Sequence, residues 1–235
     1  MNFTSPNKLI AIATMSTLSM TAQAAEIEVT ITNATQGIYY TPIIVAAHSG
    51  DAHVFETGTM ASAELQAMAE GGDISGLSSV LANIGADVAE NPAAGLLAPG
   101  MSAMAMMSTS EGNDYLSLAA MILPSNDGFV GLDSWMIPSE PGTYTFTLNA
   151  YDAGTEANDE IVNGGGAPGT PGIPAAPGGA AGTGGTGVTM SEENTYVHIH
   201  RGNMGDGDTE GGKSDLDYTV HRWLNPVAKV TVVVK

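Results

Sequence analysis

Alternation of apolar and polar residues is the feature of this chain that most constrains its fold. Residues 26–32 (EIEVTIT) place Ile27, Val29 and Ile31 on one side of an extended chain and polar side chains on the other. A period of two is typical of a β-strand with one buried face. Further strand-like runs cover residues 43–47, 101–108, 115–122, 143–150, 196–200 and 227–234. So many short strands predict an all-β fold, most economically an antiparallel β-sandwich.

One region between two of these runs follows a helical period instead. Residues 65–69 and 77–84 repeat apolar side chains at spacings of three and four, which predicts two short helices in the connection between strands. Gly71, Gly72 and Gly85 stand where these helices should end.

Residues 163–187 consist almost entirely of Gly, Pro, Ala and Thr. Such a composition offers little apolar surface to offset the entropy lost on ordering, so it predicts a long mobile loop. Strand-like runs lie on both sides of it. We therefore expect an insertion within a single domain that spans residues 25–235, and no linker between two domains.

The N-terminus resembles a cleavable signal for export. Lys8 precedes an uncharged stretch over residues 9–20, and Thr21 to Ala24 end in the small-x-small pattern that signal peptidases recognise. The sequence thus predicts a signal peptide over residues 1–24 and a mature bacterial protein in the periplasm or outside the cell. No later stretch approaches the roughly 20 apolar residues of a membrane helix, so we expect no transmembrane anchor in the mature chain.

The charge balance narrows the possible partners. The 235 residues carry 25 acidic and 6 basic side chains, for a formal net charge of −19. Phosphate-rich partners would be repelled, which argues against nucleic acid and anionic membranes and favours cations. An acidic surface that only keeps an exported protein soluble is the alternative. Cysteine is absent, so neither disulfides nor thiolate metal sites can contribute.

Two segments combine carboxylates with glycine beside strand-like runs. They are residues 124–133 (PSNDGFVGLD) and 150–156 (AYDAGTE). Loops of this kind at one end of a sandwich can bring oxygen ligands together around Ca²⁺, which accepts six to eight oxygens in flexible geometry. The alternative is that Asp and Asn in these turns only bond their own backbone.

These segments resemble those of the spondin N-terminal domain, the F-spondin and mindin family. The resemblance extends to His48-Ser49-Gly50, to residues 115–119 (YLSLA) and to residues 223–228 (WLNPVA), and so covers most of the mature chain. It implies a β-sandwich similar to C2 domains, in a secreted adhesive or matrix-associated protein, with calcium between loops.

Carried over position by position, the resemblance implies three calcium ligands: Asp127, Asp152 and Glu156. Two departures stand out. Gly128 occupies a position where the animal proteins tend to have an aromatic residue, and the cysteines of those proteins are missing. The thrombospondin-type repeats of the animal relatives are missing as well. We therefore expect a stand-alone bacterial version of the domain, and adhesion to a particular receptor does not transfer.

A second acidic segment partly matches a calcium-binding loop. Asp206, Asp208 and Glu210 alternate with small residues, and Asp217 stands at the twelfth position. The fifth and twelfth positions carry the wrong acids for an EF-hand, and no amphipathic helices flank the segment. Either a second cation site or a solvated acidic turn is compatible with this pattern.

Histidines and methionines suggest a rival function. On an extended chain, His198 and His200 point to the same face, and His48 or His221 could join them. A Met-rich run contains Met101, Met104, Met106 and Met107. Imidazole and thioether ligands suit copper or zinc, so a periplasmic copper- or zinc-binding protein is the alternative function. Met as core filler and His as a solvated surface residue are the other interpretations.

Little in the sequence indicates catalysis. Ser125, Asp127 and a histidine could form a triad only on paper, because no nucleophile-elbow context accompanies the serine. The sequence therefore predicts a protein that is not an enzyme: an exported, calcium-binding adhesive or interaction domain. Its macromolecular or carbohydrate partner and its state of assembly, including a fibre, stay open.

Overall fold

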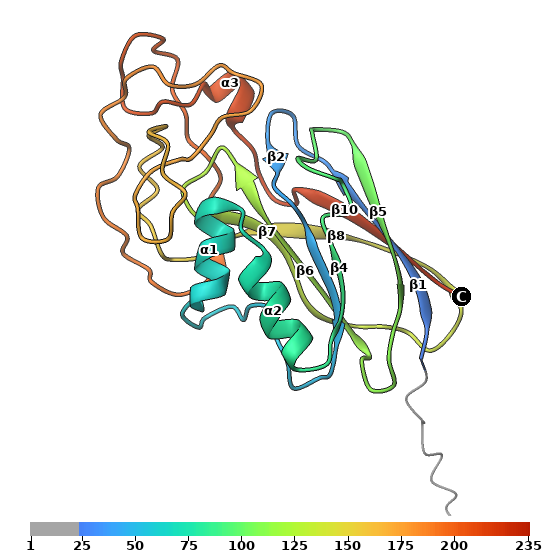
Figure 1. The fold of residues 1–235 in the computed structure, drawn as a ribbon. Coiled ribbons are helices and arrows are strands. Elements are labelled where there is room, and N and C mark those ends of the chain that lie inside the picture. The colour runs from blue at the N-terminus through green and yellow to red at the C-terminus, as the bar shows by residue number, and fades with distance from the viewer. Residues whose placement is uncertain (1–23) are drawn as a thin grey trace, which may run out of the picture.

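The computed structural model describes residues 24–235 (Figure 1). The predicted signal peptide lies outside these described residues except for its last residue, Ala24. Within the described part of the chain, no helix is long and apolar enough to cross a membrane.

Ten strands form one antiparallel sheet, which confirms the predicted all-β class. Their order is β4-β3-β6-β7-β8-β10-β1-β5, with β2 paired to β6 and β9 paired to β8. The strands are β1 (Glu26–Asn33), β2 (Tyr39–Tyr40), β3 (Ile44–His48), β4 (Asp87–Glu90), β5 (Ser102–Ser108), β6 (Tyr115–Leu123), β7 (Gly128–Met136), β8 (Gly142–Asp152), β9 (His198–Ile199) and β10 (Ala228–Val234).

Strand β8 joins the two halves of the sheet. Its residues 142–148 pair with β10, and its residues 149–152 pair with β7. A long strand that changes partners in this way turns the sheet back on itself, so the two halves pack face to face as the layers of a sandwich do. The inward side chains of β1, namely Ile27, Val29 and Ile31, are almost completely buried in the core between the halves.

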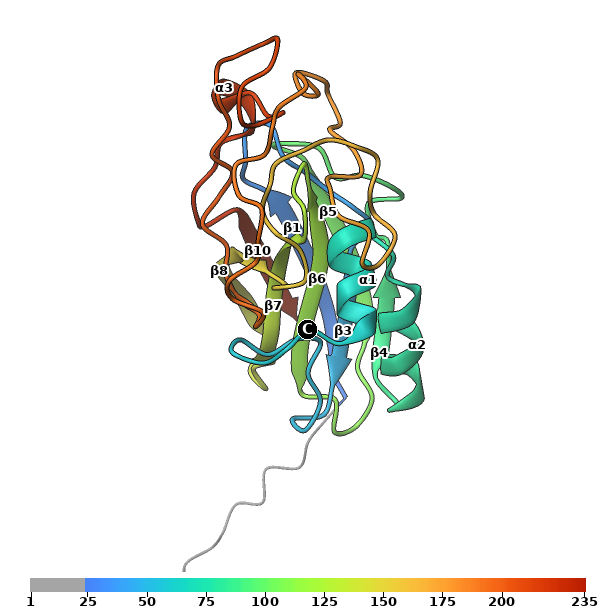
Figure 2. The same ribbon diagram turned by 90° about the vertical axis from the view of Figure 1, so that its left-hand side faces the viewer.

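Two helices cover the outer face of one half (Figure 2). They are α1 (Ala63–Gly71) and α2 (Ser75–Asn83). Ser62 begins α1 by accepting the Leu65 N–H at its hydroxyl (3.1 Å), and Gly72 ends it with a left-handed backbone (φ 72°). Both predicted helices are thus confirmed. Their apolar faces pack on the sheet in a second hydrophobic cluster, which includes Leu65, Met68, Leu77, Leu81, Met121 and Phe129.

The structure corrects the prediction in the segment 124–133. That segment was expected to be a turn, but the turn is confined to its first residues and strand β7 already starts at Gly128. The first four residues of β7 are buried on both faces, because the other half of the sheet covers one face and the helices cover the other. A strand buried on both faces shows no alternation of apolar and polar residues, so this one gave no strand signal. The short helix α3 (Tyr218–His221) was also not predicted.

The Gly/Pro-rich segment 163–187 forms neither a helix nor a paired strand, as predicted. It is nevertheless tied to the domain through its backbone. Gly169 N–H donates to Glu70 (2.6 Å), and Gly172 N–H donates to Glu156 (3.0 Å). Ile173 is completely buried. These contacts argue against free motion in this part of the loop, and the mobility of the remainder stays a prediction.

Two further buried carboxylates organise the irregular segments. Asp215 accepts hydrogen bonds from the backbone N–H groups of Val162 (2.8 Å), Gly184 (2.8 Å) and Gly185 (2.7 Å). Glu160 accepts from the Gly205 N–H (2.8 Å) and from other donors of the same segment. Backbone N–H groups that no sheet or helix satisfies thus find charged acceptors.

We predict that Asp215→Asn destabilises the protein while leaving its shape intact. In the variant, an NH₂ group would replace one carboxylate oxygen. This donor would then face backbone N–H groups that now donate to that oxygen. The expected loss is about 1–3 kcal/mol in the free energy of unfolding, measured by urea denaturation. Faster amide exchange should be confined to Val162, Gly184, Gly185 and their surroundings. Glu111→Gln, an exposed change, should have no measurable effect, and an unchanged midpoint in Asp215→Asn would contradict the role assigned to this carboxylate.

Candidate metal centre

The two predicted carboxylate segments meet at one end of the sheet. Asp127 ends the turn between β6 and β7, and Asp152 is the last residue of β8. Gly128 pairs directly with Asp152 in the ladder between β7 and β8, which fixes Asp127 beside Asp152. Glu156 follows four residues later, in the loop that leaves β8. Irregular segments between β8 and β10 gather at this end of the molecule (Figure 1).

Asp127 is the most deeply buried of these carboxylates, with no exposed surface. Its Oδ2 accepts hydrogen bonds from the Thr155 N–H (2.8 Å), the Thr155 hydroxyl (3.2 Å) and the Glu156 N–H (3.2 Å). Its Oδ1 is buried and has no hydrogen-bond partner. A buried carboxylate oxygen without a partner is costly, and a proton, a cation or a water molecule would satisfy this atom.

Asp152 is also buried, but both of its oxygens have partners. Oδ1 accepts from the Gly154 N–H (2.9 Å), and Oδ2 accepts from the Asn158 side-chain amide (2.7 Å). The His198 Nδ1 lies 3.9 Å from Oδ1. Each of these oxygens retains a lone pair that could face a cation.

Glu156 lies next to this pair in the chain but directs its carboxylate to a different set of groups. Oε2 accepts from the Gly172 N–H (3.0 Å) and from the Asn126 amide (3.4 Å), whereas Oε1 is buried without a partner. In the described residues, no three His, Cys, Asp or Glu side chains converge closely enough to form a ready-made metal centre. The structure therefore brings Asp127 and Asp152 together and leaves Glu156 beside them.

The protonation of these carboxylates reflects their burial. Burial raises the pKa of Asp127 well above its ordinary value, and the negative charge of Asp152 adds to the effect. Burial likewise raises the pKa of Asp152. It raises the pKa of Glu156 to about 7. Burial therefore disfavours the charged form of all three carboxylates, and a bound cation could take the place of the proton that burial favours.

The structure does not assemble the alternative His and Met site. Strand β5, which carries the Met-rich run, is separated from β8 and β9 by β10 and β1. His198 is partly exposed, whereas His200 is buried against Trp223, with ring centroids 5.0 Å apart. Burial lowers the pKa of His200 to about 3. The Gly202 N–H donates to its Nδ1, so the proton of the neutral ring is on Nε2.

Neither of the other two candidate histidines completes such a site. His48 donates from Nδ1 to the Ser49 carbonyl (2.8 Å) and accepts at Nε2 from the Ser117 hydroxyl (2.7 Å), so both nitrogens are engaged. His221 is buried in α3, and within residues 24–235 it is not part of any group of three His, Cys, Asp or Glu side chains placed to hold a metal ion.

The second acidic segment has the geometry of a turn that bonds its own backbone. Asp206 accepts from the N–H groups of Asp208 (3.0 Å), Lys213 (2.8 Å) and Ser214 (2.9 Å). Asp217 caps α3 by accepting the Thr219 N–H (2.7 Å). These hydrogen bonds favour the acidic turn, and a second cation bound by Asp206, Asp208 and Glu210 stays a hypothesis.

The structure also contains a cluster that the sequence did not indicate. His53 Nδ1 lies 3.1 Å from both the Asp133 Oδ2 and the Ser134 hydroxyl. Ser134 has a left-handed backbone (φ 51°) next to an irregularity in the pairing of β6 and β7. Because Asp and Ser share one nitrogen of the imidazole, the ring cannot relay a proton between them as a catalytic triad does. No periodicity signals a cluster formed across 80 residues of sequence.

Comparison with known families identifies this architecture. The spondin N-terminal domain profile (Spondin_N) matches residues 31–161, more than half of the chain and all three predicted ligand positions. The chain belongs to the spondin N-terminal domain family. The family consists of extracellular, non-catalytic interaction domains. A search of curated proteins found no match. In this spondin domain, β9, α3 and β10 lie beyond the matched region.

The raised pKa of Glu156 predicts how pH acts on the metal-free protein. Between about pH 4.5 and 7, the folded protein holds a proton on Glu156 that the unfolded chain has released. The folded state then binds more protons, so the free energy of unfolding falls as pH rises through this window. In chelator, Glu156→Gln should remove this contribution, about 1.4 kcal/mol for each pKa unit of difference. Parallel pH profiles of Tm for the parent and the variant would contradict the assignment.

Proposed function

We propose that this spondin domain binds Ca²⁺ at the end of its sheet and uses the ion to order an interaction surface. The observation that carries the proposal is the Asp127 Oδ1, a buried carboxylate oxygen without a partner, held beside Asp152. Asp127 and Asp152 would be the principal ligands. Glu156 would join them through its free Oε1 after a change in the orientation of its side chain.

The chemistry of the available donors favours calcium over softer metals. The three side chains are carboxylates, and the chain has no cysteine. Hard oxygen ligands select Ca²⁺ or Mg²⁺, and the larger ion accepts irregular geometry with backbone carbonyls and waters completing its shell. Competition between Ca²⁺ and protons for the carboxylate oxygens would weaken the binding of calcium. We expect a Kd on the order of 10⁻⁴ to 10⁻³ M, as in extracellular modules.

The ion would act on the loops through contacts that already exist. Asp127 holds the N–H groups of Thr155 and Glu156, and Glu156 holds the N–H of Gly172 in the Gly/Pro-rich segment. An ion bound by these carboxylates would therefore tie the β6–β7 turn, the end of β8 and the start of that segment together. Such ordering gives an exported interaction domain a defined surface for a macromolecular or carbohydrate partner.

Copper or zinc binding remains the weaker alternative. The partly exposed His198 near Asp152 favours it, but His200 is buried and the Met-rich strand β5 lies elsewhere in the sheet. Metal analysis of the purified protein distinguishes the two functions, because stoichiometric copper or zinc lost in His198→Ala would support the alternative.

We predict that Asp127→Asn abolishes Ca²⁺ binding without preventing folding. The amide resembles the protonated carboxyl that burial favours but removes the charge that attracts the ion. For the parent protein, Ca²⁺ at 100 times its Kd should add about 2.7 kcal/mol to the free energy of unfolding, and the variant should show no such gain. Isothermal titration calorimetry and thermal denaturation with and without chelator measure both effects.

Asp208→Asn is the matched control, since it removes one exposed carboxylate from the other acidic segment. It should keep the parent's affinity for calcium. Equal binding by the parent and Asp127→Asn, or loss of binding only in Asp208→Asn, would refute the proposed site.

A further inference from the structure

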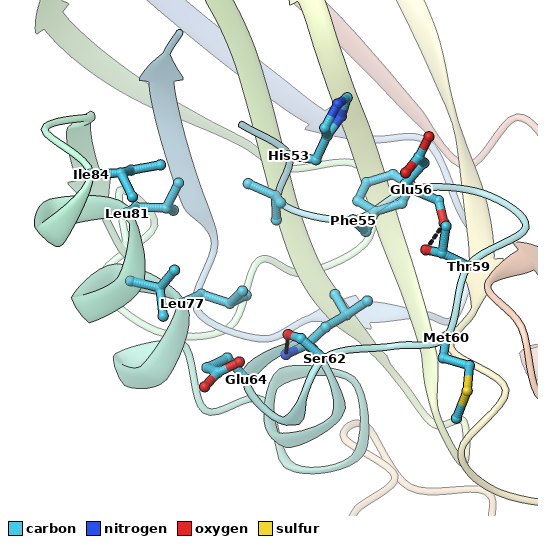
Figure 3. Close-up of a pocket in the computed structure, with 13 residues that line it drawn as sticks. His53, Phe55, Glu56, Thr59, Met60, Ser62, Glu64, Leu77, Leu81 and Ile84 are labelled. Atoms are coloured by element: carbon cyan, nitrogen blue, oxygen red, sulfur yellow. Dashed lines mark hydrogen bonds between the residues drawn. The ribbon is translucent and has the colours of Figure 1, made fainter. Parts of the chain in front are cut away.

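A groove lies between the two helices and the connection that leads from β3 to α1 (Figure 3). The groove is open to solvent on one side and has a volume of about 280 Å³. Leu77 and Leu81 point into it from α2, Ile84 does so from the cap that follows this helix, and Phe55 faces them from the connecting segment. The volume is close to the lower limit of small-molecule sites, and it suits one or two apolar side chains better than a cofactor.

The wall opposite α2 is held by packing and by backbone hydrogen bonds. The ring of Phe55 lies 5.0 Å from that of Phe129 and 4.8 Å from that of Tyr151, centroid to centroid. The Gly58 N–H donates to the Val197 carbonyl, and the Val197 N–H donates to the Thr59 carbonyl, each at 2.8 Å. The groove therefore exists before any partner arrives, which lowers the entropic cost of binding.

Apolar side chains at the mouth of the groove are unusually exposed. The exposed fraction is 70% for Met60, 45% for Val80 and 54% for Ile84. These side chains line the same groove as its apolar floor. Exposed apolar side chains gathered around a groove are typical of a site of interaction.

Carboxylates stand at the rim of the same groove. Glu56 and Glu64 line it on the side of the connecting segment and the start of α1. Neither has a salt-bridge partner within the described residues. A ligand with a large apolar group and positive charges beside it would satisfy both the floor and the rim.

We infer that this groove is a docking site for a polypeptide segment of a partner protein that carries one large apolar side chain flanked by Lys or Arg. The apolar side chain fills the cavity against Phe55 and Leu81, and the basic residues pair with Glu56 and Glu64. The charge of the domain repels anionic lipid, so a membrane surface does not fit the site. The inference goes beyond calcium binding and uses none of the proposed ligands.

A labelled six-residue peptide with a central Phe-Leu pair between two Lys-Lys pairs tests the inference by fluorescence anisotropy. Replacing Phe-Leu with Ala-Ala keeps the charge and should weaken binding at least about tenfold, since burial of one such side chain is worth about 1.5–3 kcal/mol. In the protein, Val80→Ser combined with Ile84→Ser should weaken binding of the Phe-Leu peptide by the same factor. Glu56→Gln combined with Glu64→Gln should weaken it by about fivefold.

Matched changes elsewhere control for charge and surface polarity. Leu224→Ser, at an even more exposed apolar residue outside the groove, and Glu140→Gln should leave the affinity unchanged. Equal affinity for the Ala-Ala peptide, or undiminished binding by the Val80/Ile84 variant, would overturn the inference. Circular dichroism verifies that each variant is folded. All titrations are run in calcium and again in chelator, and calcium binding is measured separately, so failure of the groove and failure of the calcium site are distinguishable.

Discussion

Hydrogen bonds from backbone N–H groups to buried carboxylates are the interaction on which the functional end of this molecule depends. The segments between β8 and β10 contain little regular structure, so the sheet and helices leave many of their N–H groups without partners. Glu70, Glu160 and Asp215 accept those groups, and Asp127 and Glu156 do the same close to the sheet. The acidity of the chain is therefore in part a structural requirement, because each carboxylate replaces secondary structure as an acceptor.

The same arrangement creates a difficulty that calcium would resolve. Holding Asp127 and Asp152 at adjacent ladder positions brings two negative charges together away from water. Protons relieve the repulsion in the metal-free protein, and a divalent cation would relieve it more completely while binding the oxygen that hydrogen bonds leave free. Outside the cell, where domains of this family are found, calcium would be available for this purpose. Stability of the loops and availability of the ion would then be coupled through one buried carboxylate.

The sequence predicted the elements whose physical signal is local. Alternation identified β1, β8 and β9, and less regular strand-like runs marked β3, β5, β6 and β10. Helical spacing with terminal glycines identified α1 and α2. It missed β7, since Gly128 to Gly131 are buried on both faces and show no alternation. It placed Asp127 beside Asp152 through resemblance to the family, but not the orientation of Glu156, which Gly172 and Asn126 determine. Nor did it indicate the groove, whose walls come from segments about 30 residues apart and which exists only once α2 packs on the sheet.

The central claim is that the buried Asp127 Oδ1 is a ligand of a bound Ca²⁺ ion. A crystal structure of the protein grown in Ca²⁺ tests it most directly. The account predicts an ion surrounded by six to eight oxygens, with Asp127 Oδ1 at about 2.3–2.6 Å, Asp152 in the same shell and the Glu156 carboxylate turned toward it. A calcium-saturated crystal in which Asp127 Oδ1 contacts no ion, and is protonated or bonded to water instead, would contradict the account.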